Sequence, residues 1–106
     1  MSLDAVLARI DADLDASLGR LFDLVRLKSI SADPTFFPEV RAAGEWCVRE
    51  LTALGFEASL RETPGQPMVV AHWRGAVKNP KVRALVYGHY DVQPVDPLSL
   101  WEADPF

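Results

Sequence analysis

Cysteine is almost absent from this sequence, and so is any excess of positive charge. The 106 residues hold a single cysteine, Cys47. No disulfide framework can therefore form within the chain, and a reducing, cytoplasmic location is expected. Eleven Lys and Arg stand against fifteen Asp and Glu, which gives a net charge of -4. Nucleic acid is not an expected partner, because phosphate binding needs a basic face.

Long apolar runs and glycine-rich loops are lacking too. No stretch approaches the roughly 20 apolar residues of a membrane span, and the aspartates near the N-terminus leave no signal-peptide core. The glycines form neither a Gly-x-Gly-x-x-Gly loop nor a Gly-Lys-Ser/Thr loop, and no serine lies in a Gly-x-Ser-x-Gly elbow. Membrane association, a dinucleotide site and serine-hydrolase chemistry are therefore not expected.

The first half of the chain has helical periodicity. Apolar residues recur every three or four positions over residues 3–27, which predicts one amphipathic helix with Gly19 as the candidate for a bend. Residues 28–34 form a predicted loop. A second helix is expected over residues 38–54, because Pro38 suits a first helical turn and Gly55 suits a left-handed C-terminal cap.

The second half has the composition of strands and turns. Strands are predicted over residues 56–60, 68–73 and 82–87, with turns over 63–67 and 75–81. The apolar run from Ala84 to Tyr87 predicts a third strand that is buried on both faces. This order of elements predicts an α/β layered architecture. No element closes the sheet after residue 87, so we expect residues 1–106 to be the N-terminal piece of a larger protein.

The residues after the third predicted strand are the best candidates for chemistry. His89 and Asp91 lie beyond the carboxyl end of that strand, where ligands bind in open α/β sheets. In extended backbone, alternate side chains point to the same side, and metal-bound imidazoles commonly donate their other N–H to a carboxylate. A His-x-Asp pair could therefore supply a metal ligand and its support. Alternatively, Asp91 caps a turn before Pro94.

A longer string around this pair carries a family resemblance. The segment LVYGHYDVQP at residues 85–94, followed by WEADPF at residues 101–106, closely resembles the first metal-binding motif of the zinc exopeptidases in family twenty of the metallopeptidases. That family holds carnosine-type dipeptidases, carboxypeptidase G, aminoacylase and succinyl-diaminopimelate desuccinylase, and GHYDVQP is most similar to the dipeptidase branch. LVRLKSIS at residues 24–31 and LGF at residues 54–56 also resemble the family's opening.

The resemblance implies roles for two residues. His89 matches the histidine that binds one zinc of a two-metal site, in which Co or Mn could replace Zn. Asp91 matches the catalytic-site aspartate that orients this histidine. The other ligands and the general-base glutamate lie beyond the motif in the family. Residues 1–106 would then be the N-terminal part of a layered α/β/α catalytic domain with a mixed central sheet.

The implied activity is hydrolysis of dipeptides or small peptides by a water that two zinc ions activate. The resemblance also implies a homodimer that forms through a downstream domain, and residues 1–106 alone are expected to be inactive. Two alternatives remain open at this point. One is an N-acyl amino acid amidohydrolase of the same family, and the other is a truncated binding domain without enzymatic activity.

Other chemistry-bearing residues have plainer interpretations. His72 is predicted to be a half-exposed strand residue rather than a ligand, and Cys47 is predicted to be a small apolar residue of a helix stripe. Trp46 and Trp73 are predicted to pack rather than to contact substrate. Trp101 is a candidate to form part of the mouth of the site.

Overall fold

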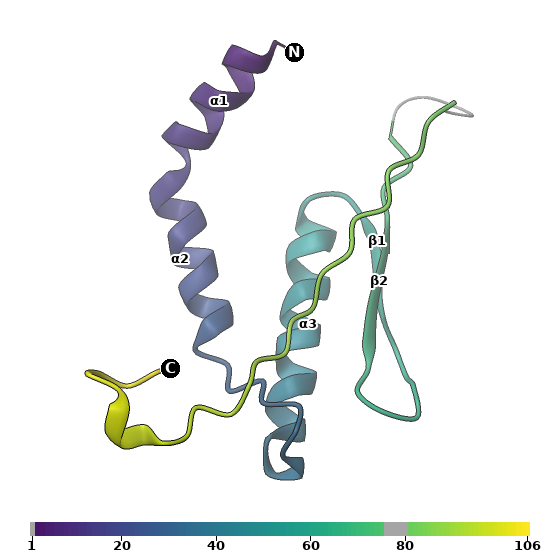
Figure 1. Cartoon of the computed structure of the whole chain (residues 1–106). Coiled ribbons are helices and arrows are strands. Elements are labelled where there is room, and N and C mark those ends of the chain that lie inside the picture. Colours follow the sequence, from purple (N-terminus) through teal and green to yellow (C-terminus); the bar gives the residue numbers. More distant parts are fainter. Residues whose placement is uncertain (1, 76–80) are drawn as a thin grey trace.

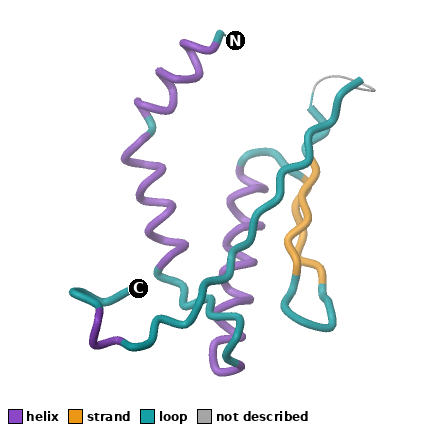
Figure 2. The backbone as a smooth tube through the Cα atoms, in the orientation of Figure 1, coloured by secondary structure: helices purple, strands orange, loops and turns teal. Residues whose placement is uncertain are grey.

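A computed structural model describes residues 2–75 and 81–106 of the chain (Figure 1). Two helices come first, α1 (Leu3–Ala12) and α2 (Leu14–Val25), followed by the short 3-10 helix η1 (Pro34–Phe36) and by α3 (Phe37–Ala53). Two strands, β1 (Glu57–Arg61) and β2 (Met68–His72), precede a second 3-10 helix, η2 (Leu98–Leu100). The chain contains both helices and strands, so the prediction of a mixed α/β fold is confirmed (Figure 2).

The predicted N-terminal helix is two helices, and the interruption lies at Asp13 rather than at Gly19. Asp13 has φ -99° and ψ 8°, and its N–H donates to the Arg9 carbonyl at 3.0 Å. Its carboxylate pairs with the Arg9 guanidinium. The Asp13 side chain makes no capping hydrogen bond to α2, and Gly19 lies inside that helix. No helix in residues 2–75 or 81–106 is long and apolar enough to cross a membrane.

Helix α3 and the β1–β2 hairpin agree closely with the sequence. Pro38 lies in the first turn of α3, and Gly55 follows the helix with a φ of 90°, the left-handed geometry expected there. The two strands pair antiparallel from Glu57 opposite His72 to Arg61 opposite Met68. The predicted turn between them is present, and α3 packs against both strands.

The core formed by these elements is small. Ile30, Val40 and Ala43 are the buried apolar residues in the described part of the chain. The apolar stripe of α1 and α2 is largely exposed, with values between 71% at Leu3 and 38% at Leu18. The radius of gyration is 16.9 Å, compared with about 13 Å for a compact domain of this length. The chain is therefore open, and its packing is concentrated around α3.

The prediction of a third strand over residues 82–87 is wrong. Residues 82–87 run as an extended segment that pairs with no strand in the described ranges (Figure 2). Leu85 is 96% exposed, and Val86 and Tyr87 are each 90% exposed. An apolar run indicates a strand that could be buried, but burial also needs a neighbouring strand, and β2 pairs only with β1 here. Residues 76–80, in the predicted turn before this segment, lie outside the described residues.

Candidate metal-ligand site

The loop after α2 contacts residues 88–92, the histidine motif, although about 60 positions separate the two segments in the sequence. Val92 N–H donates to the Ser29 carbonyl at 2.9 Å, and Ile30 forms an isolated parallel bridge with Val92. Ser29 Oγ–H donates to the Tyr90 carbonyl at 2.9 Å. Ser29 and Ile30 are only 2% and 4% exposed. These contacts fix the backbone of residues 90–92 against a buried part of the loop.

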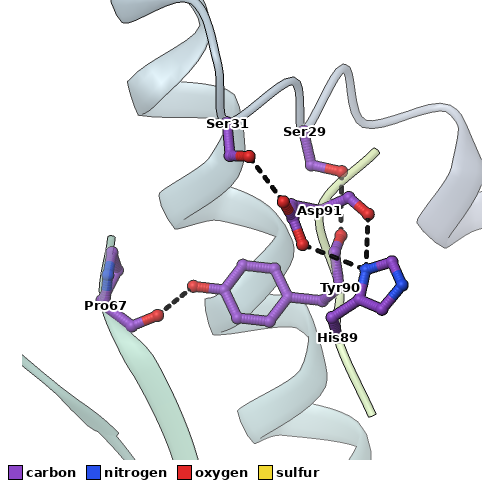
Figure 3. Close-up of polar contacts among 6 residues, drawn as sticks. All are labelled: Ser29, Ser31, Pro67, His89, Tyr90 and Asp91. Carbon is purple, nitrogen blue, oxygen red and sulfur yellow. Dashed lines mark hydrogen bonds and ion pairs between the residues drawn. The ribbon is translucent and has the colours of Figure 1, made fainter. Parts of the chain in front are cut away.

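His89 and Asp91 lie on the same side of this segment, as predicted (Figure 3). His89 Nδ1 lies 3.0 Å from Asp91 Oδ1 and 3.0 Å from the Asp91 carbonyl oxygen. Since the carbonyl can only accept a hydrogen bond, as an ionised carboxylate also does, Nδ1 is the protonated nitrogen. In a neutral imidazole, the lone pair is then on Nε2. The His89 side chain is 74% exposed, so Nε2 is accessible.

The second carboxylate oxygen of Asp91 has its own donor. Ser31 Oγ–H donates to Asp91 Oδ2 at 2.5 Å (Figure 3). The Ser31 hydrogen bond lowers the pKa of the Asp91 carboxyl most, the His89 ring lowers it further, and partial burial opposes both. The carboxyl is therefore ionised at neutral pH. Sequence reasoning missed Ser31, because no local pattern indicates a contact between residues 60 positions apart.

Tyr90 points away from the His89–Asp91 pair and toward α3 and the hairpin (Figure 3). Its hydroxyl donates to the Pro67 carbonyl, and burial raises the pKa of the phenol. A pocket of about 280 Å³ lies between these elements, and its lining includes Ser31, His89 and Asp91. Because side chains alternate along extended backbone, Tyr90 anchors the segment on one side while His89 and Asp91 lie on the other.

The donor set fits one ligand of a zinc site. A histidine that is free at Nε2 and bonded to a carboxylate at Nδ1 is a common arrangement for zinc ligation. A catalytic zinc needs about three protein ligands, and the described residues contain no group of three or more His, Cys, Asp and Glu placed to hold a metal. The described part of the chain thus offers one candidate ligand with its support, and the roles of His89 and Asp91 stay predictions.

The other two candidates for ligation lie away from this pair. His72 ends β2 and is exposed, which agrees with its interpretation as a strand residue. Cys47 lies on α3 with intermediate exposure, and burial raises the pKa of its thiol. Neither residue lines the pocket beside His89.

The tryptophans also lie away from the His89 pocket. Trp46 is partly buried on α3, and the Trp73 ring lies against Gly75 while 65% of the residue stays exposed. Trp101 donates from Nε1 to the Val95 carbonyl at 2.8 Å. It lines a separate pocket of about 310 Å³ with Val25 and Phe106, so the structure does not place it at the mouth beside His89.

Comparison with known proteins identifies the class. The chain is similar to curated metallodipeptidases, which confirms the resemblance to the dipeptidases of family twenty of the metallopeptidases found in its motifs. Its curated relatives include Cys-Gly metallodipeptidase dug1 of Schizosaccharomyces pombe, 33% identical over 116 residues, and DUG1 of Candida albicans, 35% identical over 98 residues. DUG1 of Saccharomyces cerevisiae is 26% identical over 117 residues.

These alignments cover most or all of this chain but a small part of each relative. They include 100%, 82% and 99% of the chain, against 24%, 20% and 24% of the respective relatives. The chain thus spans about a quarter of the length of the relatives it matches. No protein-family model matches the chain. No solved structure matches it either.

Proposed function

We propose that residues 1–106 form the N-terminal part of the catalytic domain of a metal-dependent dipeptidase, with the layered α/β/α architecture of its family. The observation that carries this proposal is the contact of His89 Nδ1 with Asp91 Oδ1 at 3.0 Å, within the segment Gly-His-Tyr-Asp. Similarity to Cys-Gly metallodipeptidases along the whole chain supports it. The proposed substrates are Cys-Gly and related dipeptides.

Each residue of the pair has a defined task in this proposal. His89 holds one zinc ion through Nε2, and Asp91 keeps the proton on Nδ1 and fixes the plane of the ring. The bound metal would supply a water molecule of lowered pKa and a Lewis acid for the scissile carbonyl. The proposal assigns the remaining ligands and the general base to parts of the protein outside residues 1–106. Residues 2–75 and 81–106 hold no group of three ligands.

The test compares two histidine variants of the complete protein. We expect His89→Ala to abolish nearly all release of glycine from Cys-Gly under zinc-replete conditions, because one metal ligand is lost. His72→Ala is the matched control, since this exposed histidine lies at the end of β2, outside the site. The control should keep the wild-type rate. Full activity in metal-replete His89→Ala protein would exclude the proposed role.

Substrate choice tests the class of reaction separately. The wild-type protein is assayed with dipeptides and with N-acetyl amino acids at equal concentrations, and faster hydrolysis of the dipeptides is expected. Preference for N-acetyl amino acids would instead identify an amidohydrolase. Absence of both zinc binding and hydrolysis would identify a binding domain without enzymatic activity.

A further inference from the structure

We propose that Ser31 is a positioning residue that sets the orientation of His89 through Asp91. The three side chains form one chain of hydrogen bonds (Figure 3). Ser31 Oγ–H donates to Asp91 Oδ2 at 2.5 Å, and His89 Nδ1–H donates to Asp91 Oδ1 at 3.0 Å. The effect of Ser31 on metal binding rests on the proposed function, because that effect requires His89 to be a metal ligand.

The carboxylate needs this second hydrogen bond to hold a fixed plane. The terminal torsion of aspartate has a broad energy minimum, so a carboxylate bonded through one oxygen can rotate about its Cβ–Cγ bond. The His89 side chain is 74% exposed, so packing contributes little to holding its ring. The His89 ring is therefore held through two acceptors of Asp91, the backbone carbonyl and Oδ1. The Oδ1 contact depends on the carboxylate plane, which Ser31 sets.

Ser31 is suited to this task because its own backbone is anchored. The two preceding residues, Ser29 and Ile30, are buried, and the Ser29 carbonyl accepts the Val92 N–H. The two serines act on different groups: the Ser29 hydroxyl bonds a backbone carbonyl, whereas the Ser31 hydroxyl bonds a carboxylate. Removal of the Ser31 hydroxyl should thus free Asp91 while the two segments stay together.

The first test uses the metal-free protein and the ¹⁵N chemical shifts of the His89 ring, measured where the imidazole is neutral. In wild-type protein we expect the proton on Nδ1. In Ser31→Ala we expect a larger fraction of the Nε2-protonated tautomer, because only the Asp91 carbonyl then accepts firmly from Nδ1. Ser31→Thr should restore the wild-type state, because it keeps the hydroxyl. Protection of the Val92 amide from exchange reports that the loop stays in place. A wild-type tautomer in Ser31→Ala would overturn the proposal.

The second test measures Zn²⁺ affinity of the complete protein by competition with a chelator. Ser31→Ala should weaken binding by about 10-fold, at the lower end of the usual effect for residues that orient a ligand. Ser31→Thr should stay near wild type, as should Ser99→Ala in η2, the exposed-serine control. Wild-type affinity in Ser31→Ala, together with lost affinity in His89→Ala, would overturn the proposal.

Two further outcomes distinguish failure of the Ser31 proposal from failure of the proposed function. If His89→Ala keeps the zinc affinity of wild type, the proposed function fails, and the ring tautomer alone decides the role of Ser31. If the Val92 amide of Ser31→Ala is no longer protected from exchange, Ser31→Thr is compared with Ser31→Val instead. The threonine and valine side chains have the same shape and differ in the hydroxyl. A difference between these two in the His89 tautomer supports the proposal, and identical spectra overturn it.

Discussion

Gly44 of α3 lies directly against the phenol ring of Tyr90. A Cβ added at position 44 would come within 3.1 Å of Tyr90 Oη and 2.9 Å of Leu60 Cδ1. The Tyr90 hydroxyl is held by the Pro67 carbonyl, so the ring has little freedom to move away. The absence of a side chain at position 44 thus lets α3 approach both the hairpin and the histidine motif.

We predict that Gly44→Ala destabilises the protein although alanine favours helix. The substitution gains up to about 1 kcal/mol in helix propensity. Overpacking against Tyr90 and Leu60 costs about 1–3 kcal/mol. The expected net loss in the free energy of unfolding is about 1 kcal/mol, measured by urea denaturation.

Gly19→Ala is the matched control for this measurement. Gly19 also lies within a helix, α2, but a Cβ there meets nothing within 4 Å. The free energy of unfolding should therefore rise, by up to about 1 kcal/mol. Equal stabilisation by Gly19→Ala and Gly44→Ala would contradict the close packing of Tyr90 on α3.

A second prediction concerns the pH dependence of an exposed ion pair between α3 and the residue after β1. Arg41 Nη2 donates to Glu62 Oε1 at 2.6 Å, and this hydrogen bond lowers the pKa of Glu62 below its ordinary value of 4.5. A depressed folded-state pKa stabilises the fold above the unfolded-state value. That stabilisation is lost as the pH falls through the folded-state value. The pair is solvated, so the effect on stability should be small.

The titration of Glu62 can be followed by NMR. Arg41→Ala should return its pKa toward the ordinary value, because both the hydrogen bond and the favourable charge are removed. Arg49→Ala, a control on the same helix without an ion pair to Glu62 in the described structure, should leave the titration of Glu62 unchanged. An unshifted Glu62 in the wild-type protein would show that the pair does not form in solution.

A third prediction concerns Asp91 itself. Asp91→Asn should reduce zinc affinity and kcat/KM of the complete protein by about 10–100-fold, because a neutral amide supports the His89 imidazole less well than a carboxylate. Asp11→Asn on α1 is the control for loss of one negative charge and should change neither quantity. Equal losses in both variants would attribute the effect to net charge rather than to the contact with His89.

The features that sequence predicted well depend on neighbours along the chain. Helix α3, the positive φ at Gly55 and the β1–β2 hairpin follow from periodicity, capping and turn composition. The interruption at Asp13 was missed because the apolar period continues through both helices. Periodicity reports which face is apolar and is insensitive to the backbone angles of one residue.

The features that sequence missed depend on partners far along the chain. The apolar run at residues 82–87 has the composition of a buried strand, but no described strand pairs with it. The contact of His89 with Asp91 could be predicted because alternation places both on one side. The contact of Ser31 with Asp91 could not, since it follows from the meeting of Ile30 with Val92.

A final prediction uses the one cysteine of the sequence. Cys47 is partly buried on α3, and this burial raises the pKa of its thiol above the ordinary value of 9.0. The thiolate is the reactive form, so folding should slow the reaction of Cys47 with an aromatic disulfide reagent at pH 8 relative to the urea-unfolded protein. A raised folded-state pKa also means that the stabilisation from Cys47 is complete below the unfolded-state value. It declines as the pH rises through the folded-state value. Equal reaction rates in folded and unfolded protein would place the thiol in solvent and contradict its packing on α3.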